Sequence, residues 1–382
     1  MERIAVLGCG TMGHSIALNA AWAGLSVTMQ GISDADLEQG WTNMLKKLEV
    51  MLNNGILSES EAGHIQENIK MTVSVEEAVQ GATFVIEAVP ENIQLKIDLF
   101  KRLDALCDPD VILASNTSGL SPTEIASETA HPERTVVTHF WNPAHLIPLV
   151  EVVRGEKTGD EAVERSFQLL KQMKKKPIEV KKEVPGFVGN RLQYALFREA
   201  QYLLEEGIAS KEDIDDAVTY GIGRRLPVSG PLMTADMGGL DVFSAISDYL
   251  FQHLSSAEES LPELKKLVSE QKLGDKTGEG YYKRAAYCAS KGGMVQLTKA
   301  LAVEWASNGI NVNAVAPTFI ETELTSKMFE DKEFEKEVYG RIPLGKLADA
   351  EDVSAVTLFL SSNLSKFITG DTIKVDGGWT AI

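Results

Sequence analysis

The sequence predicts an open, doubly wound α/β sheet over residues 1–185, an all-helical domain over 186–283 and a truncated α/β segment over 284–382. Three observations predict this order. Apolar strand-like runs alternate with helical stretches at first, and strand-like runs return near the C-terminus. Between them, helices are expected over 190–206, 211–220 and 240–272, with Gly and Pro residues from 221 to 231 as turn punctuation. At 382 residues the chain has room for two or three domains of about 150 residues each.

The first predicted element is a strand at residues 3–7 that passes through a glycine-rich turn into a helix. In the pattern Gly-x-Gly-x-x-Gly, the first glycine allows the tight turn and the second admits a pyrophosphate close to the backbone. The third lets the helix pack closely on the strand, and the helix N-terminus holds the diphosphate. The sequence therefore predicts a Rossmann-type dinucleotide site with contacts at Gly8, Gly10, Thr11, Met12 and Gly13.

The second strand is expected at residues 26–30, where NAD-binding proteins usually end in an acidic residue that binds the adenosine ribose. This chain has Gly31 at that point, and Asp34 is a carboxylate that could reach back to the ribose. Two interpretations stay open: weaker binding of NAD, or relaxed discrimination against the 2′-phosphate of NADP, although no Arg is placed to bind that phosphate. NAD is the predicted cofactor, and NADP is not excluded.

Residues 36–70 show two helical patterns with polar faces, broken at Gly55. Lys46 and Lys47 lie on the first pattern. Lysines on an exposed helix are usually only solvated, and the alternative is contact with a phosphorylated substrate.

The remaining strands of the first domain lead into polar side chains. These runs are 82–91, which ends at Glu91 and precedes a helix with Lys96; 111–115, followed by Asn116, Thr117 and Ser118; 134–138, followed by His139; and 148–153. Ligands bind beyond the carboxyl ends of parallel strands, so these side chains are expected along one crevice.

His139 is the candidate for proton transfer, because a dehydrogenase acting on an alcohol needs a base near neutral pH to accept the hydroxyl proton. Glu151, on the neighbouring strand, would orient the imidazole and raise its basicity. Ser118 and Asn190 would hold the substrate oxygen. Each residue also has a structural alternative: a hydrogen-bonding histidine at a strand end, and helix caps at Ser118 and Asn190.

Seven motifs then occur in one order along the chain. They are Gly8-x-Gly10-x-x-Gly13, Val89-Pro90-Glu91-Asn92, Ser115-Asn116-Thr117-Ser118, His139-Phe140-Trp141-Asn142-Pro143, Leu149-Val150-Glu151-Val152-Val153, Pro185-Gly186-Phe187-Val188-x-Asn190-Arg191 and Lys276-Thr277-Gly278-x-Gly280. Together they resemble the L-3-hydroxyacyl-CoA dehydrogenase family, which includes 3-hydroxybutyryl-CoA dehydrogenases and the related lambda-crystallin/L-gulonate 3-dehydrogenase branch. The resemblance covers residues 1 to about 283.

The resemblance implies that His139 is the acid/base, that Glu151 is its partner, and that Ser118 and Asn190 orient the substrate. It also implies a set of residues around the nicotinamide half of the cofactor: Glu91, Lys96, Ser118, Asn142 and Lys276. The helical domain of this family dimerises and closes the cleft, so a homodimer is expected. The family's ribose-binding acid is the position that Gly31 occupies.

Two adjacent arginines, Arg224 and Arg225, lie in the family's loop near the substrate. They would pair with a carboxylate or a phosphate, or they are surface charges. A CoA thioester is the family default, and a free 3-hydroxy acid remains open.

From residue 285 the sequence resembles a different family. Tyr287-Cys288-Ala289-Ser290-Lys291 and the runs 310–317 and 370–378 are similar to the C-terminal part of a short-chain dehydrogenase/reductase, in which a Tyr-x-x-x-Lys pair is catalytic. The segment lacks a second glycine-rich loop, the family's Asn-Asn-Ala-Gly strand and its upstream serine. We therefore expect no second active site, and we interpret the segment as a fusion joined near Lys283. It would be partly ordered, packed on the rest of the chain, or associated with another copy through helices at 288–308 and 351–362.

Composition excludes several classes of function. A net charge of −18 argues against a nucleic-acid or anionic-membrane partner. Cys9, Cys107 and Cys288 show neither metal-ligand spacing nor a paired framework, which suits a reducing cytoplasm, and no metal is expected. No apolar run is long enough to cross a bilayer, and a first strand at about residue 3 is expected to leave no room for a signal peptide.

The sequence thus predicts a cytoplasmic, NAD-linked dehydrogenase of short-chain (S)-3-hydroxyacyl-CoA substrates. One alternative is a dehydrogenase of a free 3-hydroxy acid such as L-gulonate. Another is a dinucleotide-binding fusion protein that has lost catalysis because its C-terminal segment blocks closure.

Overall fold

The computed structural model describes residues 2–274, 276–282, 285–320, 329 and 332–381, while the side chains of residues 285–290, 333 and 337 lie outside the description. The chain divides into two compact units, Met1–Glu199 and Ala200–Ile382. The predicted junction near Lys283 and the side chain of Tyr287 lie outside the described residues. No helix among the described residues is long and apolar enough to cross a membrane.

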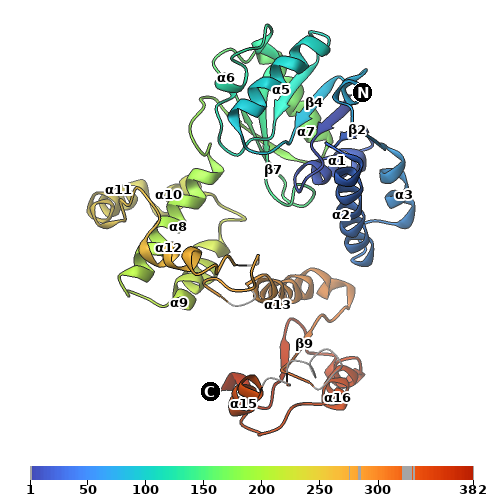
Figure 1. Cartoon of the computed structure of the whole chain (residues 1–382). Helices are drawn as coiled ribbons and strands as arrows, with labels where there is room; N and C mark the ends of the chain where they lie inside the picture. The colour runs from blue at the N-terminus through green and yellow to red at the C-terminus, as the bar shows by residue number, and fades with distance from the viewer. Residues whose placement is uncertain (1, 275, 283–284, 321–328, 330–331, 382) are drawn as a thin grey trace. The chain divides into compact units, whose positions relative to one another are not determined.

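An eight-stranded sheet forms the centre of the first unit (Figure 1). Its strands are β1 (Arg3–Leu7), β2 (Ser26–Gln30), β3 (Ile69–Thr72), β4 (Phe84–Glu87), β5 (Ile112–Ser115), β6 (Thr135–Phe140), β7 (Leu149–Val153) and β8 (Lys176–Val180). The spatial order is β3-β2-β1-β4-β5-β6-β7-β8, and every neighbouring pair is parallel except β6 and β7. The order reverses between β1 and β4, which is the switch point where such sheets bind ligands.

Helices cover both faces of this sheet. They are α1 (Gly13–Trp22), α2 (Asp34–Asn53), α3 (Glu59–Glu67), α4 (Val75–Val79), α5 (Ile93–Leu106), α6 (Pro122–Ile125) and α7 (Asp160–Gln172), while α8 (Gly189–Glu205) leads into the second unit. Strand β1 shows how the two cores form, because Ile4 and Val6 pack with α1, α2 and α7, whereas Ala5 and Leu7 pack with α4 and α5. The doubly wound α/β sheet predicted for the first domain is confirmed.

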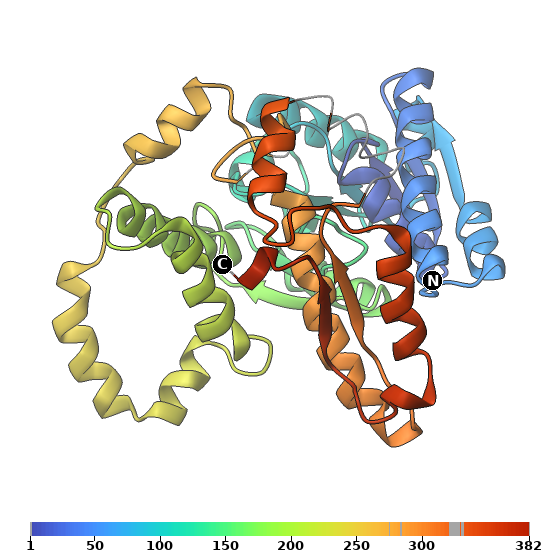
Figure 2. The same ribbon diagram turned by 90° about the horizontal axis from the view of Figure 1, so that it is seen from below.

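The second unit begins with short helices. They are α9 (Lys211–Asp216), a π-turn (Ala217–Gly221), a 3₁₀ turn (Ile222–Arg224), α10 (Pro231–Gly238), α11 (Leu240–Leu250), a 3₁₀ turn (Phe251–His253) and α12 (Pro262–Ser269). Its later part contains α13 (Ala285–Trp305), β9 (Ala314–Pro317), α15 (Lys332–Gly340), α16 (Ala350–Leu360) and β10 (Thr372–Val375). Strands β9 and β10 form a two-stranded parallel sheet against which α13 and α16 pack (Figure 2).

The structure corrects four details of the expected elements. Ile69 belongs to strand β3 and not to a helix, and β8 was not expected at all. The helical stretch expected over 240–272 is broken after His253 and resumes at Pro262, and α10 lies where only turn punctuation was expected.

Candidate active site

Two positions of the turn between β1 and α1 require glycine for steric reasons. Gly8 has a φ of +94°, and a Cβ there would lie 2.7 Å from the carbonyl oxygen of Ala88. A Cβ on Gly13 would lie 1.7 Å from the carbonyl oxygen of Gly8. Around Gly10 nothing lies within 4 Å of such a Cβ, so the backbone there is open to a ligand. These are the roles that the motif assigns to its three glycines.

The N-terminus of α1 also fits a diphosphate. Helices α2, α3, α4 and α5 are capped by Ser or Asn side chains that accept a backbone N–H, but α1 has no side-chain cap at Met12. The side chain of Thr11 is exposed beside this turn. Unsatisfied N–H groups and the positive end of the helix dipole make such a terminus a site for an anionic group.

The end of β2 differs from the usual NAD-binding pattern in its packing as well as in its missing carboxylate. A Cβ on Gly31 would lie 2.8 Å from Leu37 Cγ and 2.9 Å from Cys9 Sγ. Asp34 is exposed in the first turn of α2, where no hydrogen bond of its side chain is found among the described residues. Asp36 instead accepts the N–H of Ile32 through Oδ2 at 3.1 Å. The volume that an acidic side chain would enter at position 31 is therefore filled by side chains of the fold.

We predict that restoring an acidic residue by Gly31→Asp does not improve NAD binding. Overpacking against Leu37 and Cys9 should instead destabilise the protein by about 1–3 kcal/mol. Thermal unfolding and fluorescence titration with NADH measure the two effects. Gly63→Asp is the matched control, because nothing lies within 4 Å of a Cβ at that position. A Gly31→Asp protein of unchanged stability and tighter NADH binding would contradict the prediction.

The side chain of Lys96 is buried at the carboxyl end of the sheet, where it forms ion pairs and does not face solvent. Its side chain is 1% exposed, and its ammonium donates to Glu87 Oε1 at 2.6 Å and lies 3.5 Å from Glu91 Oε2. Glu87 is itself fully buried and also accepts hydrogen bonds from Ser115 Oγ at 2.5 Å and the backbone N–H of Val89 at 2.7 Å. Lys96 therefore holds the ends of β4 and α5 together through a fully hydrogen-bonded ion pair.

Glu91 joins this cluster to the loop after β5. Its Oε1 accepts the hydroxyl of Thr117 at 2.6 Å and the backbone N–H of Ser118 at 2.8 Å. The carbonyl oxygen of Ser118 in turn accepts the side-chain amide of Asn190 at 3.2 Å. The structure thus brings Glu91, Ser118 and Asn190 together, and Ser118 is an exposed residue there.

His139 and Glu151 face each other across the antiparallel pair β6 and β7, where they occupy directly paired register positions. The imidazole Nδ1 lies 2.8 Å from Glu151 Oε2, and the two residues are 6% and 0% exposed. The ring of His139 is flanked by the rings of Trp141 and Phe187, each with its centroid 5.7 Å away. These contacts fix the imidazole plane.

The carboxylate of Glu151 is held by further donors. The backbone N–H groups of Val188 and Gly189 donate to Oε1 at 2.9 and 3.0 Å, and Trp141 Nε1 lies 3.4 Å from Oε2. Burial opposes ionisation of Glu151, but the hydrogen bonds from His139 and these two N–H groups outweigh it and hold its pKa below the ordinary value. An ionised Glu151 requires a proton on Nδ1, so the imidazole has Nε2 available as a base.

The other predicted residues make no hydrogen bond to His139, Glu151 or Glu91 in the described part of the chain. Asn142 is exposed at the start of the loop after β6, and its side chain makes no hydrogen bond to the described residues. Lys276, Arg224 and Arg225 are exposed in the second unit, and Arg224 donates to Gln296 Oε1 at 3.0 Å. Lys47 is not simply solvated, because its ammonium donates to Ser15 and lies 2.8 Å from His14 Nε2.

Sequence reasoning placed Asn116 at the crevice without its hydrogen-bond partner, and it missed Glu87 and the backbone donors to Glu151. Asn116 Oδ1 accepts the N–H of Phe140 at 2.9 Å and so links the ends of β5 and β6. Glu87 is the partner of Lys96. The position of Glu87 at the carboxyl end of a buried strand is a signal that could have identified it, whereas the backbone donors of Val188 and Gly189 leave no mark in the sequence.

Two family models match the chain. Residues 3–184 match the NAD-binding domain of 3-hydroxyacyl-CoA dehydrogenase, and residues 214–380 match enoyl-(acyl carrier protein) reductase. The second match includes the C-terminal segment that resembles a short-chain dehydrogenase/reductase.

Similar proteins cover most of the chain. A 5-formyl-3-hydroxy-2-methylpyridine 4-carboxylate 5-dehydrogenase from Mesorhizobium japonicum is 39% identical over 74% of this chain and 90% of its own length. A probable 3-hydroxybutyryl-CoA dehydrogenase from Bacillus subtilis is 38% identical over 74% of this chain and 97% of its own. The crystal structure of (S)-3-hydroxybutyryl-CoA dehydrogenase from Ralstonia eutropha superimposes with a TM-score of 0.62 at 35% identity, over 75% of this chain and 99% of that one.

Proposed function

We propose that this chain, which belongs to the 3-hydroxyacyl-CoA dehydrogenase family, interconverts a short-chain (S)-3-hydroxyacyl-CoA, such as 3-hydroxybutyryl-CoA, and the corresponding 3-oxoacyl-CoA. The chain is an oxidoreductase with an N-terminal NAD-binding domain. The observation that carries the proposal is the buried hydrogen bond between His139 Nδ1 and Glu151 Oε2. In this pair the imidazole of His139 is the general base that oxidation of a secondary alcohol requires.

In the proposed reaction the turn at Gly8, Gly10 and Gly13 would hold NAD, which would supply the acceptor for the hydride that leaves the carbon bearing the hydroxyl group. His139 Nε2 accepts the hydroxyl proton as the carbonyl forms. Glu151 keeps the proton on Nδ1 in place and stabilises the imidazolium through their 2.8 Å hydrogen bond. In the reverse direction the imidazolium returns its proton to the oxygen of the reduced product.

The other residues of the cluster position the reactants. The exposed hydroxyl of Ser118 holds the substrate oxygen, and the amide of Asn190 fixes the Ser118 backbone through their 3.2 Å contact. Gly8, Gly10, Thr11, Met12 and Gly13 form the proposed diphosphate site. We further propose that Glu91, Asn142 and Lys276 contact the cofactor, that Asp34 lies toward its ribose, and that Lys96 acts by supporting Glu91.

A free carboxylic acid is the second candidate substrate. The Mesorhizobium japonicum relative carries a pyridine carboxylate in its name, and the exposed arginines Arg224 and Arg225 could pair with a carboxylate. In this candidate function the acid/base pair is unchanged and only the substrate differs, with L-gulonate as an example.

Steady-state kinetics separate these possibilities. We expect the full chain with NADH to reduce acetoacetyl-CoA at a higher kcat/KM than free acetoacetate at matched concentrations, and to oxidise 3-hydroxybutyryl-CoA faster than L-gulonate with NAD. Faster turnover of the free acids would support the second candidate. Binding of NADH without turnover of either class would refute both and favour the non-catalytic alternative.

We also propose a homodimer, formed through the helical part of the second unit. Helix α11 has no buried residue in the single chain, and its large apolar side chains Leu240, Phe243, Ile246 and Leu250 are all more than a third exposed. Leu232 and Met237 on α10 are 84% and 77% exposed. Apolar helix faces of this kind are expected to be covered by another chain, and a symmetric second copy is the commonest solution.

We propose three functional parts and a cytoplasmic location for this chain. We propose functional parts at residues 1–185, 186–283 and 284–382, the last of them without a catalytic role. Cys9 and Cys107 are free thiols, and burial raises the pKa of Cys9 to about 12 and that of Cys107 to about 11. Unreactive free thiols agree with the proposed cytoplasmic location.

A further inference from the structure

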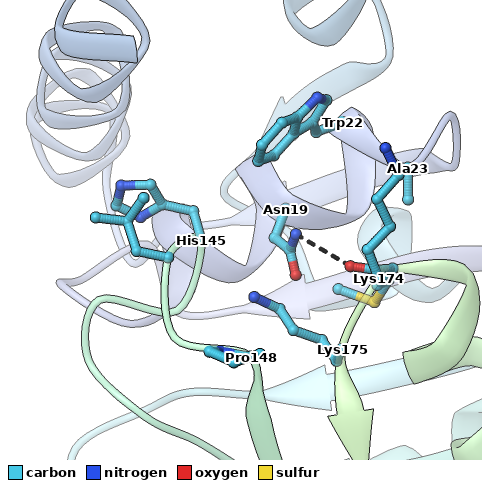
Figure 3. Close-up of a pocket in the computed structure, with 9 residues that line it drawn as sticks. Asn19, Trp22, Ala23, His145, Pro148, Lys174 and Lys175 are labelled. Carbon is cyan, nitrogen blue, oxygen red and sulfur yellow. Dashed lines mark hydrogen bonds between the residues drawn. The ribbon is translucent and has the colours of Figure 1, made fainter. Parts of the chain in front are cut away.

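The first unit contains a cavity of about 160 Å³ that shares no residue with the proposed catalytic site. Its walls come from the end of α1, the loop between β6 and β7, and the turn between α7 and β8 (Figure 3). It can hold on the order of five water molecules at about 30 Å³ each. Its main lining residues are Asn19, Trp22, His145, Leu146, Met173 and Lys175.

Lys175 places a positive charge in the wall of this cavity. The residue is 8% exposed, and its ammonium donates to the carbonyl oxygens of Ala144 and Ile147, the latter at 3.0 Å. An ammonium has three N–H donors, so one remains. Figure 3 shows Nζ directed toward Asn19. Burial lowers the pKa of Lys175 to about 8, so the group is still mostly protonated at neutral pH.

The charge near the cavity is not balanced within the described part of the chain. No carboxylate there lies within ion-pair distance of Lys175 or of Lys47, whose ammonium contacts His14. Burial lowers the pKa of His145 to about 4, with further contributions from Lys47, Lys175 and His14, so the imidazole is neutral. The two lysines therefore leave a positive region that favours an anion.

Two polar atoms beside the cavity also lack a protein partner among the described residues. They are Asn19 Oδ1 and His145 Nδ1, on residues that are 4% and 9% exposed. The amide nitrogen of Asn19 donates to the carbonyl oxygen of Met173 at 3.4 Å, which leaves its oxygen free to accept. A ligand for this cavity thus needs an acceptor for Lys175 and a donor for Asn19.

We propose that the cavity binds a small organic carboxylate that also carries a hydroxyl group. The carboxylate accepts the remaining N–H of Lys175, and the hydroxyl donates to Asn19 Oδ1. The carbon atoms of the ligand contact the half-buried Trp22 and the side chain of Leu146. This binding site is separate from the proposed reaction and does not depend on it.

Calorimetric titration of the full chain with lactate and with propionate tests the proposal. These acids have the same carbon skeleton, and only lactate has the hydroxyl, so we expect lactate to bind about tenfold more tightly. Lys175→Met should weaken lactate binding by at least about tenfold. Lys171→Met is the matched control, because Lys171 is exposed on α7, does not line the cavity, and should leave lactate affinity unchanged. That pair of variants also distinguishes the cavity from binding elsewhere.

Asn19→Leu provides a second criterion if Lys175→Met proves unfolded by circular dichroism. This variant should bind lactate and propionate equally, because it removes the acceptor for the hydroxyl. Lactate binding that neither Lys175→Met nor Asn19→Leu changes would overturn the proposal. Absence of binding by both acids, or equal binding of inorganic phosphate and lactate, would overturn it as well.

Discussion

A His139→Gln variant is expected to lose about a thousandfold in kcat while its affinity for NADH stays the same. Glutamine can still donate a hydrogen bond to Glu151, whose carboxylate is fully buried, so the site keeps its packing and its charge partner. It cannot accept a proton near neutral pH, so the hydroxyl proton has no base. NADH absorbance with acetoacetyl-CoA gives kcat, and NADH fluorescence gives the dissociation constant.

His64→Gln is the control for this experiment. His64 is an exposed histidine on α3 whose Nδ1 contacts the carbonyl oxygen of Ser60 at 2.7 Å, outside the proposed site. Its replacement should leave kcat unchanged. A His139→Gln enzyme as fast as the parent would refute the proton-transfer role, and an equal loss in both variants would point to a general loss of folded protein.

The first half of the fold could be predicted because its signals are local. The apolar residues of β1, the glycine turn and the helical spacing after it all lie within the first 22 residues. Strands β3 and β8 are not predicted from the sequence, because they lie at the two edges of the sheet, where exposed positions interrupt the apolar pattern. Pro231 and Pro262 lie in the first turns of α10 and α12. Because proline is common at helix starts, they predict these two N-termini, whereas an interpretation as turn punctuation or as part of one helix over 240–272 does not.

The candidate site could be predicted only in part. His139 and Glu151 were expected on neighbouring strands, and the antiparallel register places them opposite each other. Lys96 was expected at the cofactor, but its burial against Glu87 depends on how α5 packs on β4, which spacing does not reveal. The role of Gly31 likewise depends on how the side chains of Cys9 and Leu37 pack around it, whereas a motif comparison shows only the absent carboxylate.

The last prediction concerns Glu151→Gln, which should lower kcat by about a hundredfold or more without changing the KM for acetoacetyl-CoA. The amide oxygen of Gln will face the N–H groups of Val188 and Gly189, because an amide nitrogen there would oppose two donors. The amide nitrogen then donates to His139 Nδ1, which moves the imidazole proton to Nε2 and removes the base. Steady-state kinetics across pH measure this loss.

Stability against pH gives an independent readout of the same variant. Because the pKa of Glu151 is lowered in the folded state, its ionised form adds stability above the ordinary pKa of about 4.5, and that stability is lost as pH falls through the folded value. Glu151→Gln should lack this component, while Glu179→Gln, which removes an exposed partner of Arg154, should retain it. Wild-type and Glu151→Gln unfolding curves that depend identically on acid pH would contradict an ionised Glu151, and with it the orientation proposed for His139.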